Sequence, residues 1–222
     1  MRRRHLLIGA LACSLLVSGC SALKISTADG DSGPGRIGIN SGEQDPQPEE
    51  STSAALPEGM EMVTADLGSE CPIEMSLAMD SSWSDGAGFD GYQLFSKDSG
   101  AIITLNCNED SDDSPQAVID SAKRQMFSES GSTNLGDKYG ALPGGQYWTF
   151  HGDLAAADLR AVDGEESVMY GVVAGISKDG RLYKVTVDML AQASDTETDQ
   201  AFAQMLPTVR IDDQELEAPD LR

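Results

Sequence analysis

The chain has 222 residues, of which 37 are acidic and 15 are basic, so its formal net charge is −22 at pH 7. Such an acidic surface repels the phosphates of nucleic acids and the headgroups of anionic lipids. We therefore expect no nucleic-acid partner, and any attachment to a membrane must come from something other than a basic patch.

Residues 1–19 have the layout of a secretory signal peptide. Arg2 to Arg4 form a positive head, and the apolar run from Leu6 to Val17 is shorter than the ~20 residues of a membrane-spanning helix. The sequence Val17-Ser18-Gly19-Cys20 then resembles a bacterial lipobox. The resemblance implies cleavage before Cys20, a diacylglycerol thioether on its sulfur, and a fatty acyl group such as palmitate on the new N-terminus.

This diacyl anchor predicts a lipoprotein on the extracytoplasmic face of the cell membrane, since two chains hold stably where one does not. The alternative is an ordinary signal peptide followed by a chance cysteine. The adjacent arginines also leave open whether export follows the general secretory or the twin-arginine route.

Residues 20–59 are rich in Gly, Ser, Pro, Asp and Glu and contain no aromatic residue. Such a segment cannot bury enough apolar area to offset the entropy of ordering it. We interpret it as a disordered linker with a typical end-to-end span of roughly 35 Å.

Two cysteines remain outside the leader and the lipobox, Cys71 and Cys107, and an oxidising compartment favours a disulfide between them. Each lies on the apolar side of an alternating stretch, so both should face the same core. The alternative is a buried thiol pair or a metal site, which two cysteines without a nearby histidine do not complete.

Residues 60–213 are long enough for one domain with its own core, and residues 214–222 are predicted to be a disordered C-terminal tail. Alternating or continuous apolar runs predict strands at 71–79, 91–95, 101–107, 146–152, 158–162, 168–176, 182–190 and 209–211. In 182–190 the odd-numbered residues should face the core, whereas Lys184, Thr186 and Asp188 should face out.

Two helices interrupt the strands. Ser114 suits an N-cap and Pro115 the first helical position, and we expect this helix to end by Gly131. The second helix spans Thr196 to Leu206, and Pro207 stops it. The order of the elements predicts an α+β fold in which helices flank an antiparallel sheet.

Three stretches carry a family resemblance: the alternating run from Ile73 to Trp83, the helix start Ser114-Pro115-Gln116-Ala117, and the helix Ala201 to Leu206. Together they resemble the PsbP-like fold of the actinobacterial LpqN-type lipoproteins. The resemblance implies a non-enzymatic envelope protein that binds other proteins or lipidic molecules. It transfers no ligand-binding residue, and a fold alone is weak evidence of function.

Candidate chemistry is sparse, and we expect no cofactor. His151 should lie on the polar face of its strand and be solvated, and Trp83 and Trp148 should be core residues. The acidic run 108–113 invites a calcium interpretation but lacks the Gly and Glu of an EF-hand loop, so we interpret it as a loop preceding a helix.

Two hypotheses about function remain. The first is a membrane-anchored, non-enzymatic binding or accessory module that engages an envelope membrane protein or lipid through a sheet face or a cleft. The second is an extracytoplasmic hydrolase that uses a carboxylate pair. The second requires an acidic residue with a raised pKa inside a concave pocket. No catalytic residue is recognised, and the sequence does not predict the oligomeric state.

Overall fold

The structure is a computed structural model, and it describes residues 56–221. The predictions for the signal peptide, for Cys20 and for most of the linker lie outside the described residues. Within residues 56–221, neither helix is long and apolar enough to cross a membrane.

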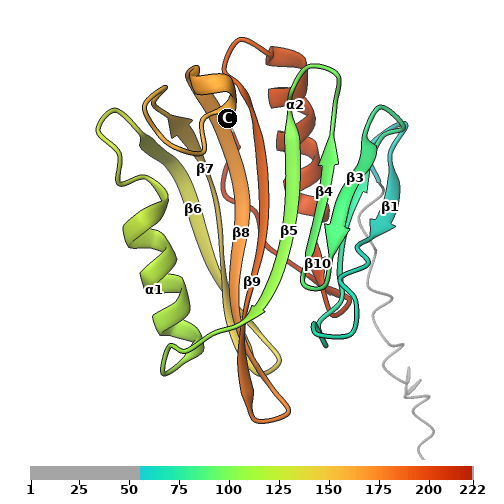
Figure 1. Cartoon of the computed structure of the whole chain (residues 1–222), viewed down its shortest axis with the longest axis vertical. Helices are drawn as coiled ribbons and strands as arrows, with labels where there is room; N and C mark the ends of the chain where they lie inside the picture. The colour runs from blue at the N-terminus through green and yellow to red at the C-terminus, as the bar shows by residue number, and fades with distance from the viewer. Residues whose placement is uncertain (1–55, 222) are drawn as a thin grey trace, which may run out of the picture. The chain divides into compact units, whose positions relative to one another are not determined.

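The fold is α+β, with two antiparallel sheets and two helices (Figure 1). This confirms the predicted fold class, with a second sheet in place of a single one. The larger sheet has the strand order β3-β4-β5-β9-β8-β7-β6. In that order its strands are Ser84–Phe89, Tyr92–Ser96, Ile102–Glu109, Arg181–Gln192, Ser167–Lys178, Gly145–Leu154 and Thr133–Leu142.

The smaller sheet has the order β1-β2-β10-β11, with strands Glu61–Thr64, Met75–Met79, Arg210–Ile211 and Gln214–Glu215. It packs with helix α2, Thr196–Met205, on one face of the large sheet, where buried residues from both sheets form the larger core cluster. Helix α1, Pro115–Met126, packs on the opposite face over a second cluster that includes Trp148 and Phe150. Figure 1 shows α1 in front of the large sheet and α2 behind it.

Helix α1 begins as predicted, because the Ser114 hydroxyl accepts a hydrogen bond from the Ala117 amide at 3.2 Å. It ends earlier than expected, at Met126, with Phe127 as its C-cap. Its first turn lies directly on β8, where a Cβ at Gly175 would come within 2.5 Å of the Pro115 carbonyl oxygen. Glycine at this position therefore lets the helix approach the sheet closely.

The predicted strand at 158–162 is wrong. The Asp158 carboxylate accepts hydrogen bonds from the backbone amide and the side chain of Arg160, which builds a turn instead. Strand β7 consequently pairs directly with β8. Strands β1, β3 and β6 were not predicted, because they are short, glycine-rich or polar.

The predicted disordered tail is also wrong for residues 214–221. Gln214–Glu215 forms β11, and Leu216 is buried. Glu217 then docks on β7, because its amide donates to the Tyr147 hydroxyl at 3.0 Å and its carbonyl accepts from the Thr149 hydroxyl at 2.7 Å. The short, mostly polar segment has too few apolar residues to give a periodic signal from which this docking could be predicted.

A disulfide joins Cys71 to Cys107, as predicted. It ties the segment preceding β2 to β5 and so connects the small sheet to the large one. Cys107 is buried and Cys71 half-buried, and the strand that was expected from residue 71 begins only at Met75.

Replacing both cysteines, Cys71→Ala with Cys107→Ala, should lower the free energy of unfolding. The bridge spans 36 residues of sequence, and closing such a loop restricts the unfolded chain by about 4 kcal/mol in the chain-entropy model. Urea unfolding of the oxidised wild type and of the double variant measures this difference. A change below about 1 kcal/mol would contradict the structural role given to the bond.

Ending the chain at Asp213 should destabilise the domain by about 2–4 kcal/mol, because the buried Leu216 and the two Glu217 backbone hydrogen bonds are lost. Glu217→Gln is the matched control. It removes only the exposed Lys138–Glu217 ion pair and should cost under about 1 kcal/mol. Equal thermal stability of the truncated and full chains would show that the tail is not docked.

Candidate functional site

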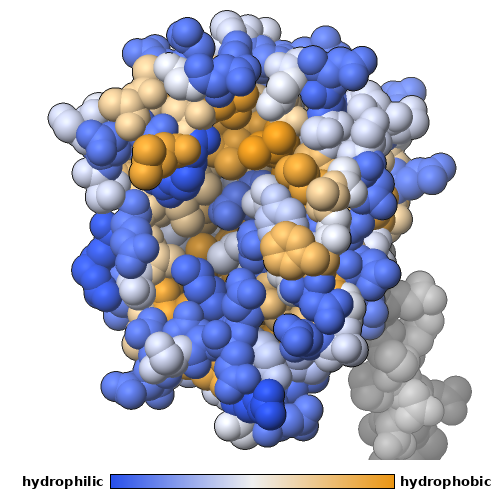
Figure 2. All heavy atoms as spheres, viewed as in Figure 1, coloured by the Kyte–Doolittle hydropathy of each residue, from blue (hydrophilic) through white to orange (hydrophobic). Residues whose placement is uncertain are grey.

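Helix α1 covers only part of its face of the large sheet. It packs on β7 and β8 and reaches β9, whereas every residue of β3 is exposed and alternate residues of β4 are half-buried. Figure 2 shows a hollow in the middle of this face, where hydrophilic side chains lie between apolar ones. This partly open face is where a site would be accessible.

A cavity of about 290 Å³ lies where the C-terminal half of α1 meets β5 and β9. Strand register places Asn108 opposite Lys184 and Asn106 opposite Thr186, so these side chains form two polar rows. Most of the lining is polar, and it comprises Asn106, Asn108, Ala122, Gln125, Met126, Arg160, Lys184, Thr186 and Asp188.

Asp188 is the acidic residue of this cavity lining. It is half-buried, and its Oδ1 atom is sealed from solvent and accepts no hydrogen bond within the described chain. Burial raises the pKa of the Asp188 carboxyl to about 6, against the opposing effect of the nearby Arg160 and Lys184 charges. A carboxylate held in this way destabilises the folded state, which is a frequent property of functional residues.

Asp188 was predicted to face out, and that prediction is wrong. Asp188 does point to the side of β9 opposite Val187, as its parity predicted, but that side is partly covered near α1. Asp188 therefore faces the layer that contains α1 rather than open solvent.

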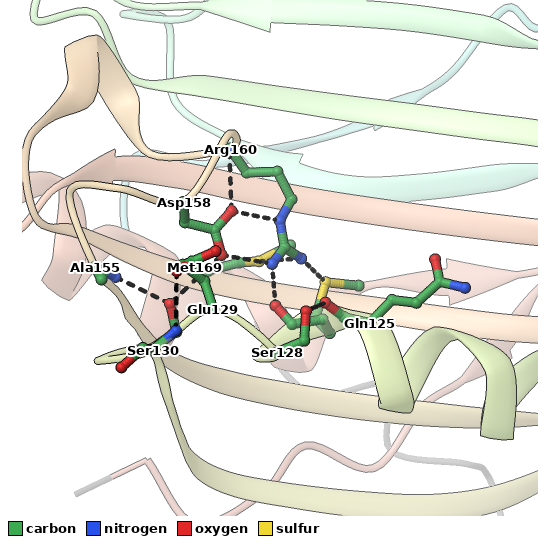
Figure 3. A network of polar contacts seen from close by, with 10 residues as sticks. Gln125, Ser128, Glu129, Ser130, Ala155, Asp158, Arg160 and Met169 are labelled. Atoms are coloured by element: carbon green, nitrogen blue, oxygen red, sulfur yellow. Dashed lines mark hydrogen bonds and ion pairs between the residues drawn. The ribbon is translucent and has the colours of Figure 1, made fainter.

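Arg160 forms the wall of the cavity between the end of α1 and the loop before β8 (Figure 3). Its Nη2 lies 2.8 Å from Asp158 Oδ2 and its Nε 3.0 Å from Asp158 Oδ1, and it also donates to the Met126 carbonyl. The hydrogen bonds from Arg160 hold the pKa of Asp158 below its usual value. Because Arg160 is paired with Asp158, it does not form an ion pair with Asp188.

Several other polar groups of the lining have no partner. The Asn106 amide donates to Thr186 Oγ1 at 3.3 Å. In contrast, the Lys184 ammonium and the side-chain amides of Asn108 and Gln125 make no hydrogen bond with any residue in the described range 56–221. The cavity therefore offers free donors near Lys184 and a free acceptor at Asp188.

His151 lies on the other face of the sheet, and its predicted solvation is wrong. It is 8% exposed and stacks on Tyr170 with ring centroids 5.5 Å apart. Its Nε2 is sealed and unpartnered, and burial lowers its pKa. Tyr170 donates to Asp199 at 2.7 Å, and burial together with this bond raises the Tyr170 pKa. The tail residue Leu221 and α2 line a cavity of about 290 Å³ beside His151.

The remaining candidates are structural. Trp83 and Trp148 are buried in the core, as predicted. In the acidic run 108–113, Glu109 pairs with Arg181 and Asp110 accepts from the Asp112 amide, while Asn108 belongs to the cavity. Among residues 56–221 there is no cluster of three or more His, Cys, Asp or Glu residues that could hold a metal ion.

The cavity itself was not predicted from sequence. The available signal was the polar alternation of Asn106 and Asn108 on β5 together with Lys184, Thr186 and Asp188 on β9. The half-buried carboxylate of Asp188, on a strand that is otherwise largely buried, becomes recognisable as unusual only when the position of α1 is known.

No protein-family model matches the sequence, and no curated protein matches it. A solved structure with a similar arrangement is LpqN, described as involved in cell envelope biogenesis of Mycobacterium tuberculosis. It is 15% identical with a TM-score of 0.48, over 68% of this chain and 91% of that one. A Bacteroides thetaiotaomicron protein matches with 8% identity and a TM-score of 0.33, over 61% of this chain and 44% of that one. Similarity at this level assigns neither a shared site nor a shared activity.

The raised pKa of Asp188 predicts how stability depends on pH. The folded-state value of about 6 exceeds the ordinary 3.8, so Asp188 favours folding below about pH 4 and loses that contribution as pH rises through 6. Relative to Asp188→Asn, the wild type should therefore lose up to about 3 kcal/mol between those limits. Urea unfolding across this pH range measures the difference. Asp98→Asn, in an exposed turn, is the control and should run parallel to the wild type.

Proposed function

We propose that the protein is a lipid-anchored accessory module on the outer side of the cell membrane, which binds a polar ligand or partner in the cavity beside α1 without catalysing a reaction. The anchoring half rests on the sequence of residues 1–20, where a signal peptide leads directly into the lipobox cysteine. The linker that follows would let the folded domain reach molecules near its anchor.

The binding half rests on one observation, the sealed and unpartnered Asp188 Oδ1 atom in the 290 Å³ cavity that also holds the unpaired Lys184. Buried polar groups are normally hydrogen-bonded, and an exception that lines a concave cavity favours a bound ligand as its partner. Among residues 56–221 the other sealed and unpartnered side-chain atoms are Trp83 Nε1 and His151 Nε2, whereas the Arg160–Asp158 bridge next to the cavity is paired.

The second candidate, a carboxylate-pair hydrolase, is favoured by the raised pKa of Asp188 in a concave pocket. Such a reaction needs a second carboxyl group across the reacting bond. Asp158 is close in sequence to the cavity residue Arg160, but its carboxylate is already hydrogen-bonded to the Arg160 side chain. Binding without turnover therefore accounts for the lining better than this chemistry does.

The anchor is tested by expressing the full chain in a bacterium that carries the lipoprotein pathway. The wild type should incorporate a labelled palmitate analogue, partition into detergent, and begin at Cys20. Cys20→Ser should neither take up the label nor begin at residue 20, whereas Cys13→Ser, within the leader, should behave as the wild type. A mature protein that is unlabelled, or that starts at another residue, would refute the proposed anchoring.

A further inference from the structure

The cavity beside α1 presents one unpaired group of each charge. Lys184 carries an ammonium without a hydrogen-bond partner in residues 56–221, and Asp188 carries a carboxyl with one unpartnered oxygen. Arg160, the other charged group that faces Asp188, is paired with Asp158. A ligand that satisfies this lining must therefore carry charge of both signs, because a purely anionic or purely cationic ligand would leave one group unpaired.

The spacing of the two groups sets the separation of the ligand's charges. Lys184 and Asp188 lie on the same side of β9 and are four residues apart, so their Cα atoms are separated by ~13 Å at the usual rise per residue. They form no ion pair with each other in the described chain. A ligand that bridges them needs its charges several bonds apart, which excludes a free α-amino acid.

The two ends of the cavity present different hydrogen-bonding groups to a ligand. At the Lys184 end, the Asn108 side-chain amide lies on the paired residue of β5 and adds a neutral donor beside the cation, which suits a phosphate. At the Asp188 end, the unpartnered carboxyl needs a hydrogen-bond donor, which a primary ammonium supplies and a quaternary one does not.

Building on the proposed binding function, we propose that this cavity binds a phosphoethanolamine group, with its ammonium at Asp188 and its phosphate at Lys184 and Asn108. The group could belong to a lipid headgroup or to a free phosphate ester, since both present the same two charges. The ammonium would provide the partner that the Asp188 carboxyl lacks, and the phosphate would provide the partner that Lys184 lacks.

Calorimetric titration of the full chain with O-phosphoethanolamine tests the proposal. Binding should be at least about tenfold tighter than binding of phosphocholine, ethanolamine or inorganic phosphate, because each comparator loses one charge-assisted hydrogen bond. Binding of inorganic phosphate as tight as that of O-phosphoethanolamine would overturn the proposal, and so would failure of O-phosphoethanolamine to bind.

Variants locate the binding in the cavity. Asp188→Asn and Lys184→Gln keep the size of the lining approximately and should each weaken O-phosphoethanolamine binding about tenfold or more. Asp98→Asn, outside the lining, should leave it unchanged. Circular dichroism verifies that each variant is folded. Unchanged affinity in folded Asp188→Asn would overturn the assignment of the ammonium to that residue.

The source of the group is distinguished with vesicles. The full chain with Cys20→Ser cannot form the proposed thioether anchor, and it should bind vesicles of phosphatidylethanolamine mixed with phosphatidylcholine, but not phosphatidylcholine alone, if the lipid is the ligand. Binding of the soluble ester without vesicle binding would support a free ester instead. Failure of all these probes would overturn the ligand proposal while the palmitate labelling at Cys20 tests the anchor independently.

Discussion

The width of one helix determines where this domain can have a site. With side chains, α1 is ~10 Å across, and neighbouring strands are ~4.8 Å apart, so one helix covers two or three of the seven strands. It lies over β7 and β8, where Trp148, Phe150 and Val173 form a dry core beneath it. The small sheet and α2 pack on the opposite face. The region beside α1, over β5 and β9, is left partly open.

The side chains of β9 reflect this change of environment along one strand. Its odd-numbered residues from Tyr183 to Met189 are buried against the small-sheet side throughout. Its even-numbered residues pass from the half-buried Lys184 through Thr186 and Asp188 to the buried Leu190 under α1. Asp188 lies between these two environments. It is half-buried, its Oδ1 atom is sealed from solvent, and that atom has no hydrogen-bond partner in the described chain. Its cost to stability is therefore explained most simply by a role in binding.

The sequence predicted what depends on local pattern. The Ser114-Pro115 helix start, the strands at 168–176 and 182–190 and the pairing of Cys71 with Cys107 follow from capping, apolar periodicity and strand parity. Parity also placed His151 and Asp188 on the correct sides of their strands. It could not show that those sides are covered, because the covering elements are the distant tail and α1. The edge strands β3 and β6 escaped prediction because exposed edges carry little apolar periodicity.

The central claim is that Asp188 is a desolvated carboxyl without a protein partner at the border of the open face. The most direct measurement is a pH titration of its carboxyl carbon by NMR in the ligand-free protein, assigned by comparison with Asp188→Asn. We expect a midpoint of about 6. A midpoint at the ordinary value of 3.8 would show that the group is hydrated or paired, and the cavity would then have no unsatisfied charge for a ligand to match.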